Sequence, residues 1–222
     1  MSVTAPSLQS RGPRRVLIVV LVGLAVALLW FVTQTLHYLT NYSPASYTGY
    51  FWHRRAGLIP HLTGGALAIS AGLVQIWLGF TNRVGRLHRT LGKVYGGGVL
   101  LAAVGGIYLA LTIPGHLAYS AGLLMLDVAW LITTGMALYA VRSHRIEQHR
   151  EWMLRSYIVT FAFVTFRLAT YWLQRWIHGP GAGDSVAEDI ESLMAWACWA
   201  VPLLVAEPLI QLRSMKRSVR RQ

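Results

Sequence analysis

The sequence predicts an all-α fold, a six-helix transmembrane bundle with both termini in the cytoplasm. The 222-residue chain is 55% hydrophobic and only 13% charged, with a mean hydropathy of +0.45. A domain of this size cannot bury so much apolar surface inside itself. The apolar residues gather in six continuous runs of roughly 20 residues, the length that crosses a bilayer. Composition therefore excludes an ordinary soluble domain, a disordered chain and a collagen.

The six apolar runs are expected to form one helical domain between two basic ends. Backbone polar groups in lipid must be satisfied within their own segment, so each continuous run predicts a helix. A membrane barrel would show alternating strands instead. We expect a basic N-terminus at 1–15, the six-helix domain at 16–212 and a basic tail at 213–222. The expected spans are 16–36, 58–80, 91–113, 118–141, 154–176 and 190–212.

The first run has two interpretations. It follows Arg11, Arg14 and Arg15, as the apolar region of a secretory signal peptide follows basic residues. However, the run exceeds the usual length of about 7–15 residues for such a region, and the segment 28–31 offers no small-residue cleavage site. We therefore interpret it as a retained signal-anchor helix.

The second and third runs each carry a stripe of small residues. The second begins beside Pro60, a residue favoured at a helix start, and its stripe continues from His61 to Gly79. The stripe of the third extends from Gly92 to Gly106. Such stripes are typical of close helix packing in membranes. The alternative is that they leave space for a flat cofactor beside an imidazole.

The fourth, fifth and sixth runs each contain one charged residue, Asp127, Arg167 and Glu207. A charge at mid-bilayer costs about 2.5–3.5 kcal/mol, so these side chains are expected in the bundle interior. Asp127 and Arg167 lie at similar depth, and a buried ion pair between them is one hypothesis. The other is that Arg167 receives an anionic group such as a cofactor carboxylate. Glu207 lies at the depth of Gln75, so we expect it to find a partner across the bundle.

The basic residues predict the orientation. Lys and Arg number 20 against 8 Asp and Glu, a formal net charge of +12. Most of them lie on one side if the N-terminus is cytoplasmic, as the positive-inside rule requires. We therefore expect a multi-pass protein of a bacterial-type inner (plasma) membrane, with anionic lipids at its basic cytoplasmic loops. No basic patch is interleaved with aromatic residues, so we expect no nucleic-acid partner.

A family resemblance rests on three stretches, RLHRTLGKVY at 86–95, HREWMLRSY at 149–157 and TFRL at 165–168. They resemble a widespread bacterial family of predicted multi-pass membrane proteins with a domain of unknown function. The resemblance covers about 57–173, with His61 as a further marker, and implies a helical membrane bundle without a settled activity. The layout is also similar, more loosely, to transmembrane cytochrome b bundles, in which histidines on adjacent helices hold haem b.

These features support one main hypothesis, a haem b-binding membrane electron carrier or oxidoreductase. His88 and His149 would ligate the haem iron on the cytoplasmic side, because haem b needs two imidazoles facing each other. On the outer side His61 would pair with His116 or His53, and Arg167 would hold a propionate. A redox partner or a quinone would then be the partner, but the sequence does not give the substrate or the electron donor or acceptor. The sequence identifies no catalytic residue and leaves open both the oligomeric state and whether the protein is an enzyme.

Three alternatives remain at this point. The first is a non-catalytic membrane scaffold or accessory subunit, in which histidines and glycines only pack. The second is a small transporter with a polar path through Asp127, Arg167 and Glu207. The third is a cytoplasmic zinc site built from His and Glu residues between the fourth and fifth spans, His144, Glu147, His149 and Glu151.

Overall fold

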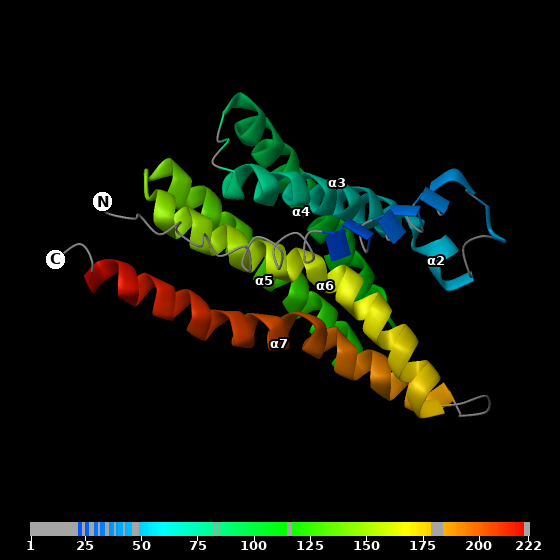
Figure 1. The fold of residues 1–222 in the computed structure, drawn as a ribbon. Coiled ribbons are helices and arrows are strands. Elements are labelled where there is room, and N and C mark those ends of the chain that lie inside the picture. The colour runs from blue at the N-terminus through cyan, green and yellow to red at the C-terminus, as the bar shows by residue number, and fades with distance from the viewer. Residues whose placement is uncertain are drawn as a thin grey trace, which may run out of the picture.

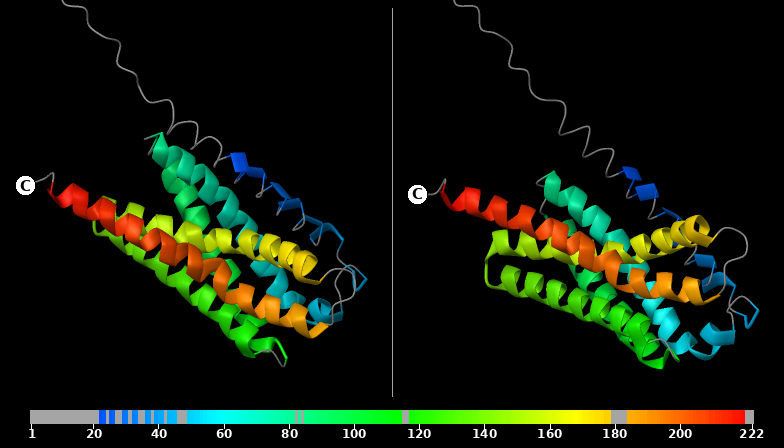
Figure 2. Two further views of the ribbon diagram at one scale, coloured as in Figure 1. Left: turned by 60° about the horizontal axis from the view of Figure 1, so that its bottom comes forward. Right: turned by 90° about the horizontal axis from the view of Figure 1, so that it is seen from below.

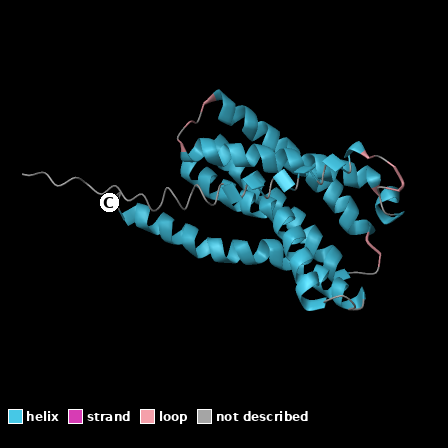
Figure 3. Ribbon diagram, turned by 45° about the vertical axis from the view of Figure 1, so that its right-hand side comes forward, coloured by secondary structure: helices cyan, strands magenta, loops and turns pink. Residues whose placement is uncertain are grey.

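The computed structural model describes residues 49–81, 83, 85–114, 117–178 and 184–219, together with scattered positions between 22 and 45. Within them every regular element is a helix (Figure 3). The helices are α2 (Gly49–His53), α3 (Arg55–Phe80), α4 (Arg86–Thr112), α5 (Leu117–Arg142), α6 (Ile146–His178) and α7 (Asp184–Val219). The predicted all-α fold is thereby confirmed.

Five of the described helices, α3 to α7, are long and apolar enough to cross a membrane. They correspond to the second to sixth predicted spans. The first predicted span, 16–36, lies largely outside the described residues. Two helices extend well beyond their predicted spans, since α6 begins at Ile146 and α7 continues to Val219. The reason is that hydropathy marks the part of a helix that suits lipid, whereas the helix itself continues through flanking charged residues.

The helices form an antiparallel bundle with two ends (Figure 1). At one end α4 passes into α5; we call this the α4–α5 end. At the other, α5 passes into α6; we call this the α5–α6 end. Helices α3 and α4 form the most extensive pair, α4 also contacts α5, and α7 packs on α5 and α6 (Figure 2). Chain direction alternates, so His61 and Arg167 lie towards the α4–α5 end, and His88 and His149 at the opposite end.

Glycine allows the close approach of α3 and α4. A Cβ atom on Gly64 would lie 2.5 Å from the backbone nitrogen of Ala102 and from the carbonyl oxygen of Gly98. No side chain of either helix can move to relieve a clash with backbone atoms. The small-residue stripes of these two helices therefore serve helix packing, as the sequence favoured.

The bundle has a buried centre and an apolar outer surface. Tyr95, Val99 and Trp130 are at most 1% exposed and belong to the central core. Large aliphatic side chains face outwards, such as Leu111 and Leu204, which are 68% and 71% exposed. Such a surface is unfavourable in water and suits contact with lipid.

Candidate functional site

A pocket of about 770 Å³ lies at the α4–α5 end, and we call it the His61 pocket. Its volume is in the range of small-molecule sites, roughly 300–1,000 Å³. The walls combine aromatic and aliphatic side chains with a few polar groups from α3, α5, α6 and α7. Its polar side chains include His61, Asp127, Arg167 and Thr170, and its rings include Tyr119, Phe163 and Phe166.

His61 is held in one orientation by α4. Its Nδ1 lies 2.9 Å from the carbonyl oxygen of Ala102, so Nδ1 donates a hydrogen to this acceptor. The ring of Phe163 packs edge-on against the imidazole, with centroids 5.2 Å apart. With Nδ1 carrying the hydrogen, the neutral ring presents Nε2 as an acceptor. A metal-ligating or ligand-binding histidine is commonly fixed in this way.

Asp127 is a buried carboxyl group without a full set of partners. The residue is 2% exposed, and its Oδ1 makes no hydrogen bond. Its carboxyl group packs directly on Gly106 of α4, where a Cβ atom would overlap Oδ2. Thr170, which is 8% exposed, also has an Oγ1 atom without a partner. Burial of an unpaired polar group is costly, and both residues belong to the lining of the pocket.

The hypothesis of an Asp127–Arg167 ion pair is wrong. Arg167 lines the same pocket and interacts electrostatically with His61, yet no ion pair joins it to Asp127. Arg167 is also exposed on the bundle surface rather than buried. A long arginine side chain can cover apolar surface and place its charge at the edge of the protein. The equal depth of two residues along their helices does not show in which direction their side chains point.

Next to the pocket, five buried side chains form what we call the central hydroxyl cluster. They are Tyr95, Trp130, Thr134, Ser156 and Thr160, all at most 4% exposed. The Tyr95 hydroxyl lies 2.6 Å from Ser156 Oγ and 2.7 Å from Thr160 Oγ1. Trp130 Nε1 donates to Thr160 Oγ1 at 2.8 Å, and Thr134 Oγ1 lies 2.7 Å from Ser156 Oγ.

One assignment of hydrogens satisfies the whole cluster. Thr160 Oγ1 donates to the backbone oxygen of Ser156, so Tyr95 must donate to Thr160. Ser156 then donates to Tyr95, and Thr134 donates to Ser156. Each hydroxyl has one hydrogen to give, and here each gives it to an acceptor. The cluster joins α4, α5 and α6 and leaves no side-chain group of its own unpaired.

His88 and His149 lie together at the α5–α6 end. His149 Nδ1 donates to the carbonyl oxygen of Ala137 at 2.9 Å, the same arrangement as His61 on Ala102. His88 lies near enough to His149 for the two imidazoles to interact electrostatically, and its Nδ1 is buried without a partner. Gln75, which is 7% exposed, donates to the backbone oxygen of His88 at 2.8 Å.

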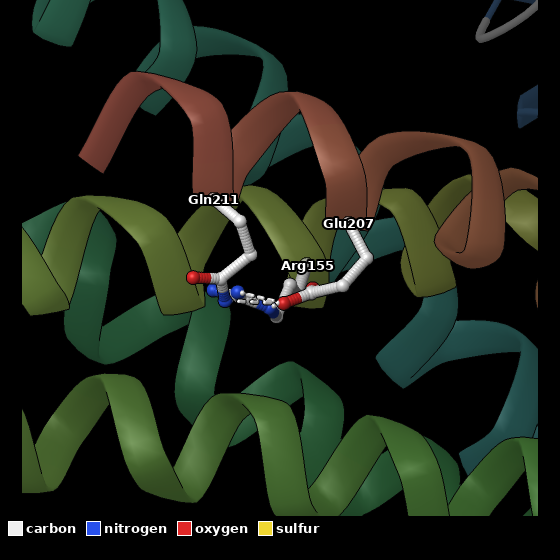
Figure 4. Close-up of polar contacts among 3 residues, drawn as sticks. All are labelled: Arg155, Glu207 and Gln211. Atoms are coloured by element: carbon white, nitrogen blue, oxygen red, sulfur yellow. Dashed lines mark hydrogen bonds and ion pairs between the residues drawn. The ribbon is translucent and has the colours of Figure 1, made fainter. Parts of the chain in front are cut away.

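Glu207 of α7 pairs with Arg155 of α6 (Figure 4). Arg155 Nε and Nη2 donate to the two carboxylate oxygens of Glu207, each at 2.8 Å, and Gln211 adds a third hydrogen bond. The Arg155 guanidinium also lies 4.9 Å from the ring centroid of Trp152. The Glu207 side chain is 43% exposed, so the expectation that Glu207 is buried is wrong, whereas the expected partner on another helix is present.

The remaining candidate residues are not assembled into a site. His116 lies outside the described residues. His53 is exposed on α2 and is absent from the lining of the His61 pocket. Within the described parts of the chain no three His, Cys, Asp or Glu side chains gather as a metal site would require, so the zinc hypothesis for the α5–α6 connection has no support there.

Comparison with known families identifies the chain. Residues 58–210, more than half of its length, match the family described as Predicted membrane protein (DUF2306). The chain belongs to the DUF2306 family. This description and the five apolar helices agree with the multi-pass membrane protein of unknown function that the sequence resembled. No curated protein and no solved structure matches this DUF2306 chain. The matched range contains His61, Asp127, Arg167 and Thr170 of the His61 pocket.

Proposed function

We propose that this DUF2306 protein binds a small amphipathic molecule in the His61 pocket, within the membrane. One observation carries the proposal. Two buried polar atoms without partners, Asp127 Oδ1 and Thr170 Oγ1, belong to residues that line the same cavity. Each leaves a free-energy cost that a hydrogen-bonding occupant would remove. In the predicted orientation, the pocket lies on the outer side of a bacterial-type inner membrane.

The pocket chemistry favours this function over the scaffold and transporter hypotheses. A scaffold has no need for unpaired polar groups around a cavity, because packing alone favours apolar or fully bonded residues. A polar transport path would require Glu207 to join Asp127 and Arg167, whereas Glu207 pairs with Arg155 at the other end of the bundle. Binding requires only the groups that the pocket already brings together.

The direct test is to identify what co-purifies with the protein. We would extract small molecules from protein purified in native-lipid nanodiscs and quantify them by mass spectrometry. The wild type is compared with the double variant Asp127→Leu/Thr170→Val. The matched control is Thr165→Val, because the Thr165 hydroxyl bonds only to Phe161 of its own helix. We expect one amphipathic species enriched in wild type and control, and depleted in the double variant. Identical extracts from folded samples of all three would overturn the proposal.

The second candidate function is electron transfer through haem b at the α5–α6 end, favoured by the arrangement of His149. Its Nδ1 is used by the Ala137 carbonyl, so Nε2 is free to ligate iron, and His88 lies nearby on α4. Bound haem would supply one-electron chemistry. Arg167 cannot hold a propionate there, because it lies 18 residues from His149 on the same helix, about 27 Å away.

An optical spectrum tests this candidate. Purified protein should show a Soret band that sharpens into distinct visible bands on dithionite reduction. His149→Ala should abolish the band, whereas His144→Ala, a change at an exposed histidine of the α5–α6 connection, should preserve it. A spectrum without a Soret band, from cells supplied with haem, would remove this function and leave the pocket proposal intact.

A further inference from the structure

We infer that the α5–α6 end of the bundle is a binding surface for anionic phospholipids, whose headgroup phosphates are held by arginine and lysine side chains. This surface is separate from the His61 pocket, which lies at the α4–α5 end. Four features support it. They are an excess of exposed cations, the absence of partners for them within the described protein, the meeting of two basic segments, and exposed aliphatic side chains beside the cations.

The first feature is the excess of positive charge. The exposed cations of this end lie in the α3–α4 and α5–α6 connections, in the adjoining helix ends and at the end of α7. They are Arg83, Arg86, Arg89, Lys93, Arg142, Arg145, Arg150, Arg213 and Lys216. Acidic residues are few here, since the sequence has no Asp or Glu before Asp127. Glu147 and Glu151 lie at the start of α6, and Glu207 is paired with Arg155.

The second feature is that these cations are unpaired. Within the part of the chain that the structure describes, none of their side chains forms an ion pair or a hydrogen bond. At the opposite end, in contrast, Arg54 donates to the backbone oxygen of Thr112 and Arg55 donates to that of Trp52. The cations of the α5–α6 end therefore keep their donors for an external anion, and the planar arginine fork matches the geometry of a phosphate.

The third feature is that two basic segments far apart in the sequence, 83–93 and 142–150, meet at this end. His88 of α4 interacts electrostatically with His149 of α6. A Cβ atom on Gly96 of α4 would lie 3.8 Å from Leu138 Cδ1 of α5, so the first turns of α4 lie beside the last turns of α5. The end of α7 lies on the same side of the molecule (Figure 1). Their positive potentials therefore add over one surface.

The fourth feature decides between lipid and a soluble polyanion. Leu87 directly follows Arg86 and is 58% exposed, and Ile146 directly follows Arg145 and is 49% exposed. A phospholipid offers a phosphate to the cation and an acyl chain to the neighbouring aliphatic side chain. A nucleic acid or an acidic protein would satisfy the cations and leave the aliphatic side chains in water, which is unfavourable. An anionic lipid leaflet satisfies both.

The test measures how tightly the full-length protein in mild detergent binds dioleoyl phosphatidylglycerol and dioleoyl phosphatidylcholine, by native mass spectrometry. The two lipids share their acyl chains and differ in headgroup charge. The double variant Arg89→Gln/Arg150→Gln removes one cation from each basic segment. The matched control, Arg55→Gln/Arg175→Gln, removes the same charge from the α4–α5 end.

We expect the wild type and the control to bind phosphatidylglycerol about tenfold more tightly than phosphatidylcholine. The Arg89→Gln/Arg150→Gln variant should lose about fivefold in affinity for phosphatidylglycerol, the factor for one cation near an anionic surface, and keep its affinity for phosphatidylcholine.

Equal binding of the two lipids by the wild type would overturn the inference. Equal losses of phosphatidylglycerol affinity in the two double variants, both folded by size-exclusion chromatography, would overturn it as well, because net charge rather than this surface would then control binding. If the wild type binds both lipids equally and co-purifies with a nucleic acid that the Arg89→Gln/Arg150→Gln variant loses, the surface binds nucleic acid and the lipid assignment is wrong.

Discussion

The central hydroxyl cluster and the His61 pocket are adjacent, and they differ in how their polar groups are bonded. On α5, Trp130 of the cluster follows Asp127 of the pocket by one helical turn. On α6, Thr160 belongs to the cluster and Thr170 to the pocket. Thr160 Oγ1 gives one hydrogen bond and receives two, whereas Thr170 Oγ1 has none.

The difference separates a structural role from a binding role. A buried hydroxyl with all its bonds made contributes to the packing of the helices that it joins. A buried hydroxyl or carboxyl with no bond reduces the stability of the empty protein. Polarity within the bundle is therefore a weak indicator of function, and unmet hydrogen-bonding capacity is a stronger one.

The largest effect should come from Thr160→Val. This change removes the acceptor shared by Tyr95 and Trp130, and leaves the buried Trp130 Nε1 donor without a partner. We expect a loss of about 2 kcal/mol in the free energy of unfolding, measured by SDS titration in detergent micelles. Thr165→Val is the control, because its hydroxyl bonds to its own helix and should cost much less. Equal losses in the two variants would mean that the cluster adds nothing to stability.

The fold was predictable because lipid imposes one requirement on every span. An unbroken apolar run must form a helix, so residues 58–212 could be divided into helices from composition alone. Helix ends such as Ile146 were missed because charged residues continue a helix without extending its apolar run. The packing role of the small-residue stripes was also predictable, since a side chain at Gly64 would clash with the backbone of α4.

The site was only partly predictable. Asp127, His61 and Arg167 were recognised because polar groups in lipid are costly. Their arrangement was not, because depth along a helix leaves rotation around the helix axis undefined. The partner of Glu207 was not recognised for a related reason, since the sequence does not show that the Arg155 side chain points towards Glu207. Thr170 carried no sequence signal, because an unpaired hydroxyl looks like any other threonine.

A smaller loss of stability is expected at the Arg155–Glu207 pair, which is a third polar region. It tests whether hydrogen-bonded charges stabilise the bundle as hydrogen-bonded hydroxyls do. Arg155 is 11% exposed and Glu207 43% exposed at the side chain, so solvent screens the pair in part. Glu207→Gln should cost about 1 kcal/mol, because the amide oxygen can replace one of two charge-assisted bonds. A double-mutant cycle with Arg155→Met measures the coupling. A coupling energy of zero would mean that this pair, unlike the hydroxyl cluster, does not stabilise the fold.

The smallest effect, and the most informative, should come from Thr170→Val. It is the same substitution as Thr160→Val, ten residues further along α6, in a side chain that is 8% exposed and unpaired. Removing an unpaired hydroxyl should stabilise the ligand-free protein by about 0.5 kcal/mol, the opposite sign to Thr160→Val. The measurement is again SDS titration, now on protein depleted of co-purifying molecules and on protein that retains them. With the ligand retained, the gain should shrink or reverse, because Thr170 then has a partner to lose. If Thr170→Val destabilises the ligand-free protein as much as Thr160→Val does, Thr170 is already bonded in the membrane and the contrast between pocket and cluster does not hold.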